Sequence, residues 1–236
     1  MDPAWLADPA RQAPVTIDPG YYVSPADGAG IDTFVQTGIS SGQAGSTELR
    51  AGTYNGGGTL ARSPIRWDLS WLPSPERVVT DAYFTLHNFY SYSCAARDVH
   101  VHRLGGGFDG ATNWATQPPL AGVVTARPFS HGYSGACPAA WEGFSITGLA
   151  NEWVNQAAPN YGVAVTAPEW DSYAWKKFSS AQTGARPGLH ITYNTLPSEA
   201  GPIAPADGAV LTTDQPALSV NPASDAEGDP CATGSG

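Results

Sequence analysis

The chain has few charged residues and no long apolar segment. Asp, Glu, Lys and Arg make up 14 % of its 236 residues, whereas an ordinary soluble domain has about 25 %. No apolar run approaches the roughly 18 residues that a membrane-spanning helix needs, so we expect no membrane insertion. The opening residues, Met1-Asp2-Pro3, have neither the basic start nor the apolar core of a signal peptide.

Positive charge is especially scarce. Lys and Arg number 11 against 21 Asp and Glu, so the formal net charge is −10. A negative surface repels phosphate groups. We therefore expect neither nucleic acid nor an anionic membrane surface as a partner.

Glycine, proline and aromatic residues are plentiful instead. The 27 Gly and 21 Pro predict many turns. The 8 Trp, 10 Tyr and 7 Phe supply large apolar surfaces for a core. The length fits one large domain or one and a half, and we expect a folded chain that is not mainly helical.

Two of the three cysteines, Cys94 and Cys137, belong to no CxxC pair and have no histidine at zinc-finger spacing. A disulfide between them is the simplest interpretation, and two buried free thiols are the alternative. A disulfide favours an oxidising compartment, so we expect a secreted, extracellular protein. Cys231 is left without a partner.

Composition divides the chain into four parts. Residues 1–20 read as a lead-in from a preceding domain, and residues 21–196 as the main domain. The proline-spaced stretch 197–205 predicts a linker. Residues 206–236 contain two candidate strands, too few to bury a core, and so resemble the truncated start of an immunoglobulin- or fibronectin-like β module. We interpret the whole as a fragment of a longer secreted protein.

Apolar residues alternate with polar ones throughout the main domain, which predicts short strands. For example, Ile65, Trp67 and Leu69 share one face, and Arg66 and Asp68 share the other. The expected strands are 32–36, 47–51, 60–69, 80–89, 97–104, 122–127, 140–146, 161–167, 174–179 and 188–193.

One segment has helical spacing instead. Thr147 is a candidate N-cap, and Leu149 and Trp153 lie four residues apart on one face. So many strands with one short helix exceed a single open sheet. We therefore predict an all-β fold, a two-sheet antiparallel jelly-roll sandwich, with Trp67, Trp114 and Trp153 in its core.

Sequence motifs for catalysis are missing. There is no Gly-x-Ser-x-Gly, His-Glu-x-x-His or Walker sequence. Glycoside cleavage requires two paired carboxylates. The sequence contains acidic residues, but nothing in it brings two of them together, so solvent-exposed acids in loops are the simpler interpretation. We expect no enzyme, with a polysaccharide lyase or glycosidase as the rival; the acids concerned are Asp109, Glu142, Glu152, Glu169 and Asp171.

Three histidines form a weak candidate for a metal site. His100 and His102 alternate with two valines and therefore point away from the core, as His87 does on the preceding strand. If the two strands form a hairpin, the three imidazoles share an outer surface and could bind zinc or copper. No fourth ligand is evident, and outward polar residues are ordinary on a sandwich.

Exposed aromatic residues near acids form the candidate ligand site. A sugar ring can stack on tryptophan or tyrosine, and carboxylates accept hydrogen bonds from hydroxyl groups. Loops on a rigid scaffold often carry such residues, although packing of the loops explains them equally. The set consists of Tyr90, Tyr92, Glu169, Trp170, Asp171 and Tyr173. No cofactor is expected except a structural calcium ion, for which Asp18, Asp27 and Asp32 are candidates.

Several stretches, in this order and spacing, resemble a known family. They are Trp5-Leu-Ala-Asp-Pro-Ala-Arg, Pro14-Val-Thr-Ile-Asp-Pro, Asp32-Thr-Phe-Val-Gln, Arg62-Ser-Pro-Ile-Arg-Trp-Asp-Leu-Ser, Asn113-Trp-Ala-Thr-Gln-Pro, Phe144-Ser-Ile-Thr-Gly-Leu-Ala-Asn-Glu-Trp, Lys177-Phe-Ser-Ser and Pro187-Gly-Leu-His-Ile-Thr-Tyr. Together they resemble the DNRLRE-type β-sandwich domain of actinobacterial wall-associated and RHS (YD-repeat) secreted proteins.

The resemblance implies a jelly-roll sandwich, an extracellular location and a non-catalytic role. Some members of the family are grouped with carbohydrate-binding modules. The expected partners are therefore a polysaccharide or cell-wall glycan and the neighbouring domains of the parent chain. A structural spacer in a toxin-type RHS protein is the alternative.

Overall fold

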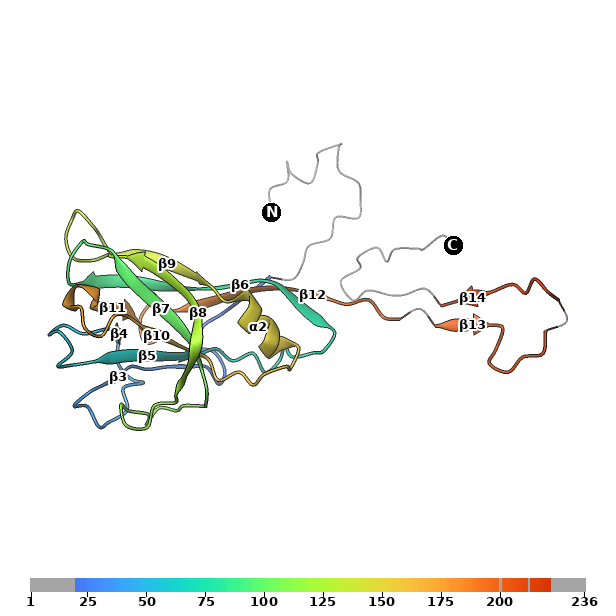
Figure 1. Cartoon of the computed structure of the whole chain (residues 1–236), viewed down its shortest axis with the longest axis horizontal. Coiled ribbons are helices and arrows are strands. Elements are labelled where there is room, and N and C mark those ends of the chain that lie inside the picture. The colour runs from blue at the N-terminus through green and yellow to red at the C-terminus, as the bar shows by residue number, and fades with distance from the viewer. Residues whose placement is uncertain (1–19, 200, 212, 222–236) are drawn as a thin grey trace.

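The described part of the computed structural model comprises residues 20–199, 201–211 and 213–221. The predicted lead-in segment before residue 20, Asp18 and Cys231 lie outside these ranges. Two antiparallel sheets face each other (Figure 1). The first sheet contains, in order, β1 (Gly20–Val23), β12 (Gly188–Thr195), β6 (Arg77–Ser91), β11 (Lys176–Ser179) and β4 (Glu48–Ala51), with β9 (Ala140–Ser145) also paired to β6. The second sheet contains β2 (Ile31–Asp32), β5 (Ala61–Arg66), β10 (Val163–Thr166), β7 (Arg97–Leu104) and β8 (Leu120–Phe129), with β3 (Val35–Gln36) also paired to β5.

The predicted all-β sandwich is confirmed, because alternating side chains of both sheets meet in one core. Trp67 packs on Phe84 with ring centroids 5.1 Å apart, and Phe84 packs on Phe144 at 5.2 Å. All three are fully buried. Each of the ten predicted strands overlaps an observed one, whereas β1 was not foreseen. Trp153 is buried as expected, but Trp114 is only partly buried and lies outside the core.

The hairpin that the three-histidine hypothesis requires, between the strands at 80–89 and 97–104, is not formed. The first of these belongs to β6 in the first sheet, and the second is β7 in the second sheet. The chain crosses from one layer to the other between them. Alternation shows which side chains point inward, but both sheets share the same interior, so alternation cannot assign a strand to a sheet.

The helix α2 (Thr147–Val154) is confirmed, with Leu149, Ala150, Trp153 and Val154 buried against the sandwich. The predicted N-cap role of Thr147 is wrong. Ile146 occupies the N-cap position and makes no side-chain capping bond. The Thr147 hydroxyl instead accepts a hydrogen bond from Ala82 N at 3.0 Å and donates one to Ala82 O at 3.2 Å, which ties the helix start to β6.

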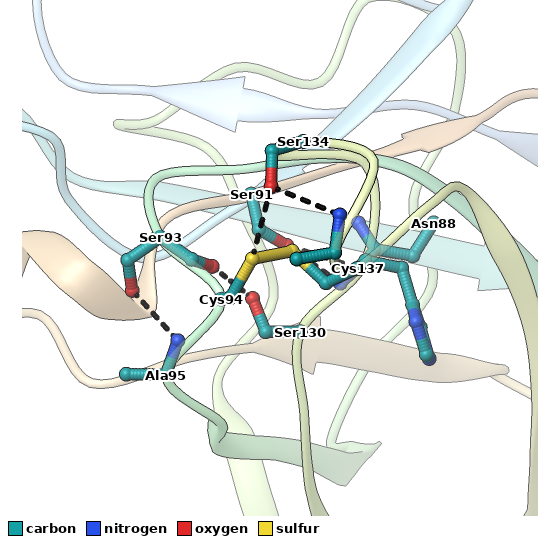
Figure 2. Close-up of a disulfide and its surroundings, with 10 residues drawn as sticks. Asn88, Ser91, Ser93, Cys94, Ala95, Ser130, Ser134 and Cys137 are labelled. Carbon is teal, nitrogen blue, oxygen red and sulfur yellow. Dashed lines mark hydrogen bonds between the residues drawn. A yellow bond between two sulfur atoms is a disulfide. The ribbon is translucent and has the colours of Figure 1, made fainter.

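The predicted disulfide between Cys94 and Cys137 is present, with Cα atoms 5.6 Å apart. It joins the loop between β6 and β7 to the loop between β8 and β9 (Figure 2). Ser134 Oγ lies 3.4 Å from the Cys94 sulfur. Gly132 has φ +78°, and a Cβ there would come within 2.0 Å of Phe89 O in β6, so the close approach of the β8–β9 loop to this strand requires glycine.

A short pair of strands, β13 (Pro202–Ala204) and β14 (Ser219–Val220), lies beyond the end of the sandwich (Figure 1). β13 falls inside the stretch predicted as a linker. The four domain boundaries otherwise stay predictions. Within the described ranges, no helix has the length and apolar character needed to cross a membrane.

Candidate ligand groove

A pocket of about 270 Å³ opens on the outer face of the second sheet. Strands β5, β7, β8 and β10 and the loop after β10 contribute to it. We call it the Trp170 groove, and its lining includes Arg62, His100, His102, Leu120, Val123, Thr166, Glu169 and Trp170.

A larger pocket of about 620 Å³ lies beside α2, but two of its polar side chains, Asp68 and Asn160, are already engaged. Asp68 accepts hydrogen bonds from Ala29 N at 2.9 Å and Ser70 N at 3.0 Å. Asn160 donates to Trp67 O at 2.9 Å. The smaller groove is the better candidate because an exposed aromatic ring and titratable groups meet there.

Strand pairing brings the groove residues together. Val99 and Val101 of β7 are fully buried, so His100 and His102 between them face outward. β10 pairs with β7 so that Thr166 lies opposite His100. On the other side, β8 places Val123 opposite His102. The loop that leaves β10 after Thr166 lines the same pocket as the two imidazoles.

The two imidazoles are neighbours, with ring centroids 6.2 Å apart. His102 Nε2 lies 3.1 Å from Thr166 Oγ1. Burial lowers the pKa of His102, and the positive charges of His100 and Arg62 lower it further. At neutral pH His102 is therefore an uncharged imidazole that can both donate and accept a hydrogen bond.

Arg62 closes one side of the groove in a fixed position. Its Nε and Nη2 atoms donate to the two carboxylate oxygens of Glu169 at 2.7 and 3.1 Å. Its guanidinium lies 4.9 Å from the ring centroid of Trp114, and Nη1 is 3.4 Å from Gln117 Oε1. The bidentate pair neutralises the Arg62 charge and occupies Glu169, which is therefore not a free acceptor for a ligand.

Trp170 follows Glu169 directly and stands at the rim of the groove. Its side chain is 79 % exposed, the largest exposure among the aromatic residues that the structure describes. A planar ring held on a loop next to hydrogen-bonding groups can stack with another planar group.

The six predicted ligand residues do not form one site. Glu169 and Trp170 line the groove, but Asp171 turns to Arg97, whose Nε donates to it at 2.5 Å. That hydrogen bond lowers the pKa of Asp171. Tyr173 lies under Arg97 and 6.5 Å from the Tyr92 ring. The remaining member, Tyr90, lies beside Lys177.

The predicted metal sites are not assembled. His87 belongs to the first sheet, where its Nδ1 lies 3.1 Å from Ser179 Oγ, away from His100 and His102. Asp32 accepts a hydrogen bond from Ala181 N, and Asp27 accepts one from Ser24 N. Within the part of the chain that the structure describes, no three His, Cys, Asp or Glu residues are grouped so that they could hold a metal ion.

In the sequence, His100, His102, Glu169 and Trp170 belong to separate hypotheses, and none of these hypotheses includes Arg62. An outward arginine on a strand is a weak signal by itself. Strand β10 precedes the loop that carries Glu169. The pairing of β5 with β10 therefore brings Arg62 to the Glu169 carboxylate.

No family model matches the chain. Three curated proteins are similar to it in alignments of 210 positions that cover 83 % of the chain. They are the tRNA nuclease WapA of Bacillus subtilis strain 168 at 25 % identity, the tRNA3(Ser)-specific nuclease WapA of Bacillus spizizenii at 24 %, and the tRNA(Glu)-specific nuclease WapA of Bacillus subtilis subsp. natto at 25 %. The chain spans about 8 % of the length of each relative.

These names overturn three predictions. The function as a non-catalytic, glycan- or wall-binding module is wrong, as is the exclusion of an enzyme, because the relatives are described as nucleases. The exclusion of nucleic acid is also wrong, because their printed substrate is tRNA. The net charge and the motifs are those of 236 residues, a small share of the relatives' length. They therefore give no information on the charge or chemistry of the whole relatives.

Proposed function

We propose that the chain is a β-sandwich part of a tRNA nuclease related to the WapA proteins, and that this part does not select which tRNA is cut. The proposal is supported by one feature of the comparisons. The chain is 24–25 % identical to all three relatives over the same length, although two of their names give different tRNAs as substrates. A segment that is equally similar to these two relatives does not vary with the tRNA that each of them cuts.

An exchange experiment tests this proposal. Residues 20–195 of the chain replace the matching segment of the tRNA3(Ser)-specific relative and, separately, of the tRNA(Glu)-specific relative. Total tRNA is then incubated with each chimera, and the cleaved species are identified by sequencing. We expect each chimera to cut the tRNA of the relative that supplied its remaining sequence. The proposal would be contradicted if both chimeras cut the same tRNA, because at least one of them would then differ from the relative that supplied its remaining sequence.

We also propose that the sandwich folds in an oxidising environment, as part of a secreted, wall-associated protein. The Cys94–Cys137 disulfide supports this, since such bonds persist outside the reducing cytosol. Thiol alkylation of the protein taken from the culture medium or wall fraction, before and after reduction, tests it. Both cysteines should be protected before reduction, and labelling without reduction would contradict the assignment.

The DNRLRE-type assignment is also a proposal, supported by two antiparallel sheets and one short helix after the ninth strand. A crystal structure of an established DNRLRE-type domain tests it. The same strand order, with a helix at the same point, is expected; a different order would exclude the assignment.

A further inference from the structure

The Trp170 groove has the features of a site for one planar ring that carries hydrogen-bonding groups. Its lining includes the indole of Trp170, which is 79 % exposed, and the imidazoles of His100 and His102. Leu120 and Val123 add apolar surface. Every nucleobase has a π face that stacks on an aromatic side chain without regard to sequence. The imidazoles can bond the edge of a base or a ribose hydroxyl.

Size and accessibility limit the ligand to unpaired RNA. A volume of about 270 Å³ admits a single nucleotide but not a base-paired stem. In a duplex the base faces are covered by their neighbours, whereas loops and ends present them. All tRNAs contain such unpaired nucleotides.

We propose that the Trp170 groove binds one unpaired RNA nucleotide, with its base on the Trp170 indole and its polar edges against His100 and His102. This inference rests on the proposed function, because the relatives' tRNA substrate supplies the ligand class. It also extends that function, since stacking holds any base and therefore assists binding without selecting a tRNA.

Charge in and around the groove indicates that stacking, more than phosphate attraction, provides the affinity. Glu169 neutralises Arg62, and the chain as a whole carries −10. Binding driven by phosphate contacts weakens steeply as salt is added. Binding by stacking in this groove should not weaken between low and moderate salt, and should strengthen slightly, because added ions screen the repulsion between the chain and RNA.

Equilibrium binding of a short single-stranded RNA of mixed sequence to the 236-residue chain tests the proposal, with the same strand annealed to its complement as the comparison. Trp170→Ala should weaken binding of the single strand by about 5- to 100-fold, the usual range for loss of one stacked base. Trp141→Ala is the matched control, since Trp141 is 50 % exposed on β9 of the other sheet, and it should leave binding unchanged. The duplex should bind more weakly than the single strand.

His100→Ala is the second variant, and it should also weaken binding, since it removes an imidazole that lines the groove. Three results would overturn the proposal: no binding of the single strand, equal losses in Trp170→Ala and Trp141→Ala, or equal binding of duplex and single strand. None of these results bears on the outcome of the segment-exchange experiment. Conversely, a chimera that cuts the wrong tRNA would refute the proposed function and leave the binding result intact.

Discussion

The two faces of strand β7 differ in what they contribute. Val99 and Val101 are fully buried between the sheets, whereas His100 and His102, one position along, line the Trp170 groove. β5 repeats the pattern, with Ile65 buried inside and Arg62 outside. The interior face supplies the burial that stabilises the fold, and the outer face supplies groups for a ligand. Stability and binding should therefore respond to different substitutions.

Two charged residues break this division because they lie inside the sandwich. Asp32 is 2 % exposed and Lys176 is fully buried. Burial raises the pKa of Asp32 to about 6 and lowers the pKa of Lys176 to about 8. Lys176 Nζ has no hydrogen-bond partner among the described residues. Both side chains cost stability when charged.

The largest expected effect comes from removing an interior ring. Trp67→Ala deletes a fully buried side chain that contacts Phe84, and it should lower the free energy of unfolding by about 3–5 kcal/mol. Urea denaturation monitored by circular dichroism measures the loss. A loss below about 1 kcal/mol would mean that this face of the strand does not provide the core.

Loss of the disulfide should have the next largest effect. The paired change Cys94→Ser with Cys137→Ser opens a bridge between positions 43 residues apart. The chain-entropy model gives about 4 kcal/mol as the upper value for a loop of this length. Reducing agent should lower the melting temperature of the wild type and leave that of the double variant unchanged. An equal response of the two proteins would contradict a stabilising disulfide.

The Asp32 carboxyl should make stability depend on pH. Between about pH 4 and pH 6 the native carboxyl keeps its proton while the unfolded chain loses it, so stability falls as pH rises through this window and then levels off. Asp32→Asn removes the charge and retains an oxygen that can accept the hydrogen bond of Ala181 N. It should remove this pH dependence and stabilise the protein at pH 7 by on the order of 2–3 kcal/mol. Unfolding measured from pH 4 to 7 tests this, and a variant that keeps the wild-type slope would contradict it.

The smallest effect on stability is expected on the outer face. Trp170 is 79 % exposed, so Trp170→Ala should change the free energy of unfolding by no more than about 0.5 kcal/mol. Thermal unfolding beside the RNA-binding measurement provides the check. A variant destabilised by more than about 1 kcal/mol would show that Trp170 supports the fold, and the separation of the two faces would fail at the groove.

The sequence predicted well what depends on local patterns. Alternation correctly placed Ile65 and Trp67 inside and His100 and His102 outside, and helical spacing located α2. Turn-rich segments marked most strand ends. The disulfide followed from cysteine spacing and the lack of another role.

Properties that depend on long-range pairing were not predictable. The assignment of β6 and β7 to different sheets separates His87 from His100 and His102. The pairing of β10 with both β5 and β7 assembles Arg62, the two histidines and the Glu169–Trp170 loop, which are far apart in sequence. The activity printed for the relatives was not foreseen for another reason: net charge and motif content describe only the residues given, and the relatives are far longer.

The most direct test of the account is a titration of ¹⁵N-labelled chain with single-stranded RNA, followed through the indole N–H signals of the tryptophans. The Trp170 signal should shift first and furthest, together with backbone signals of His100 and His102. The Trp67 signal from the interior and the Trp141 signal from the other sheet should stay in place. A shift at Trp141 without one at Trp170, or no shift at all, would contradict the assignment of the groove as the ligand-binding face.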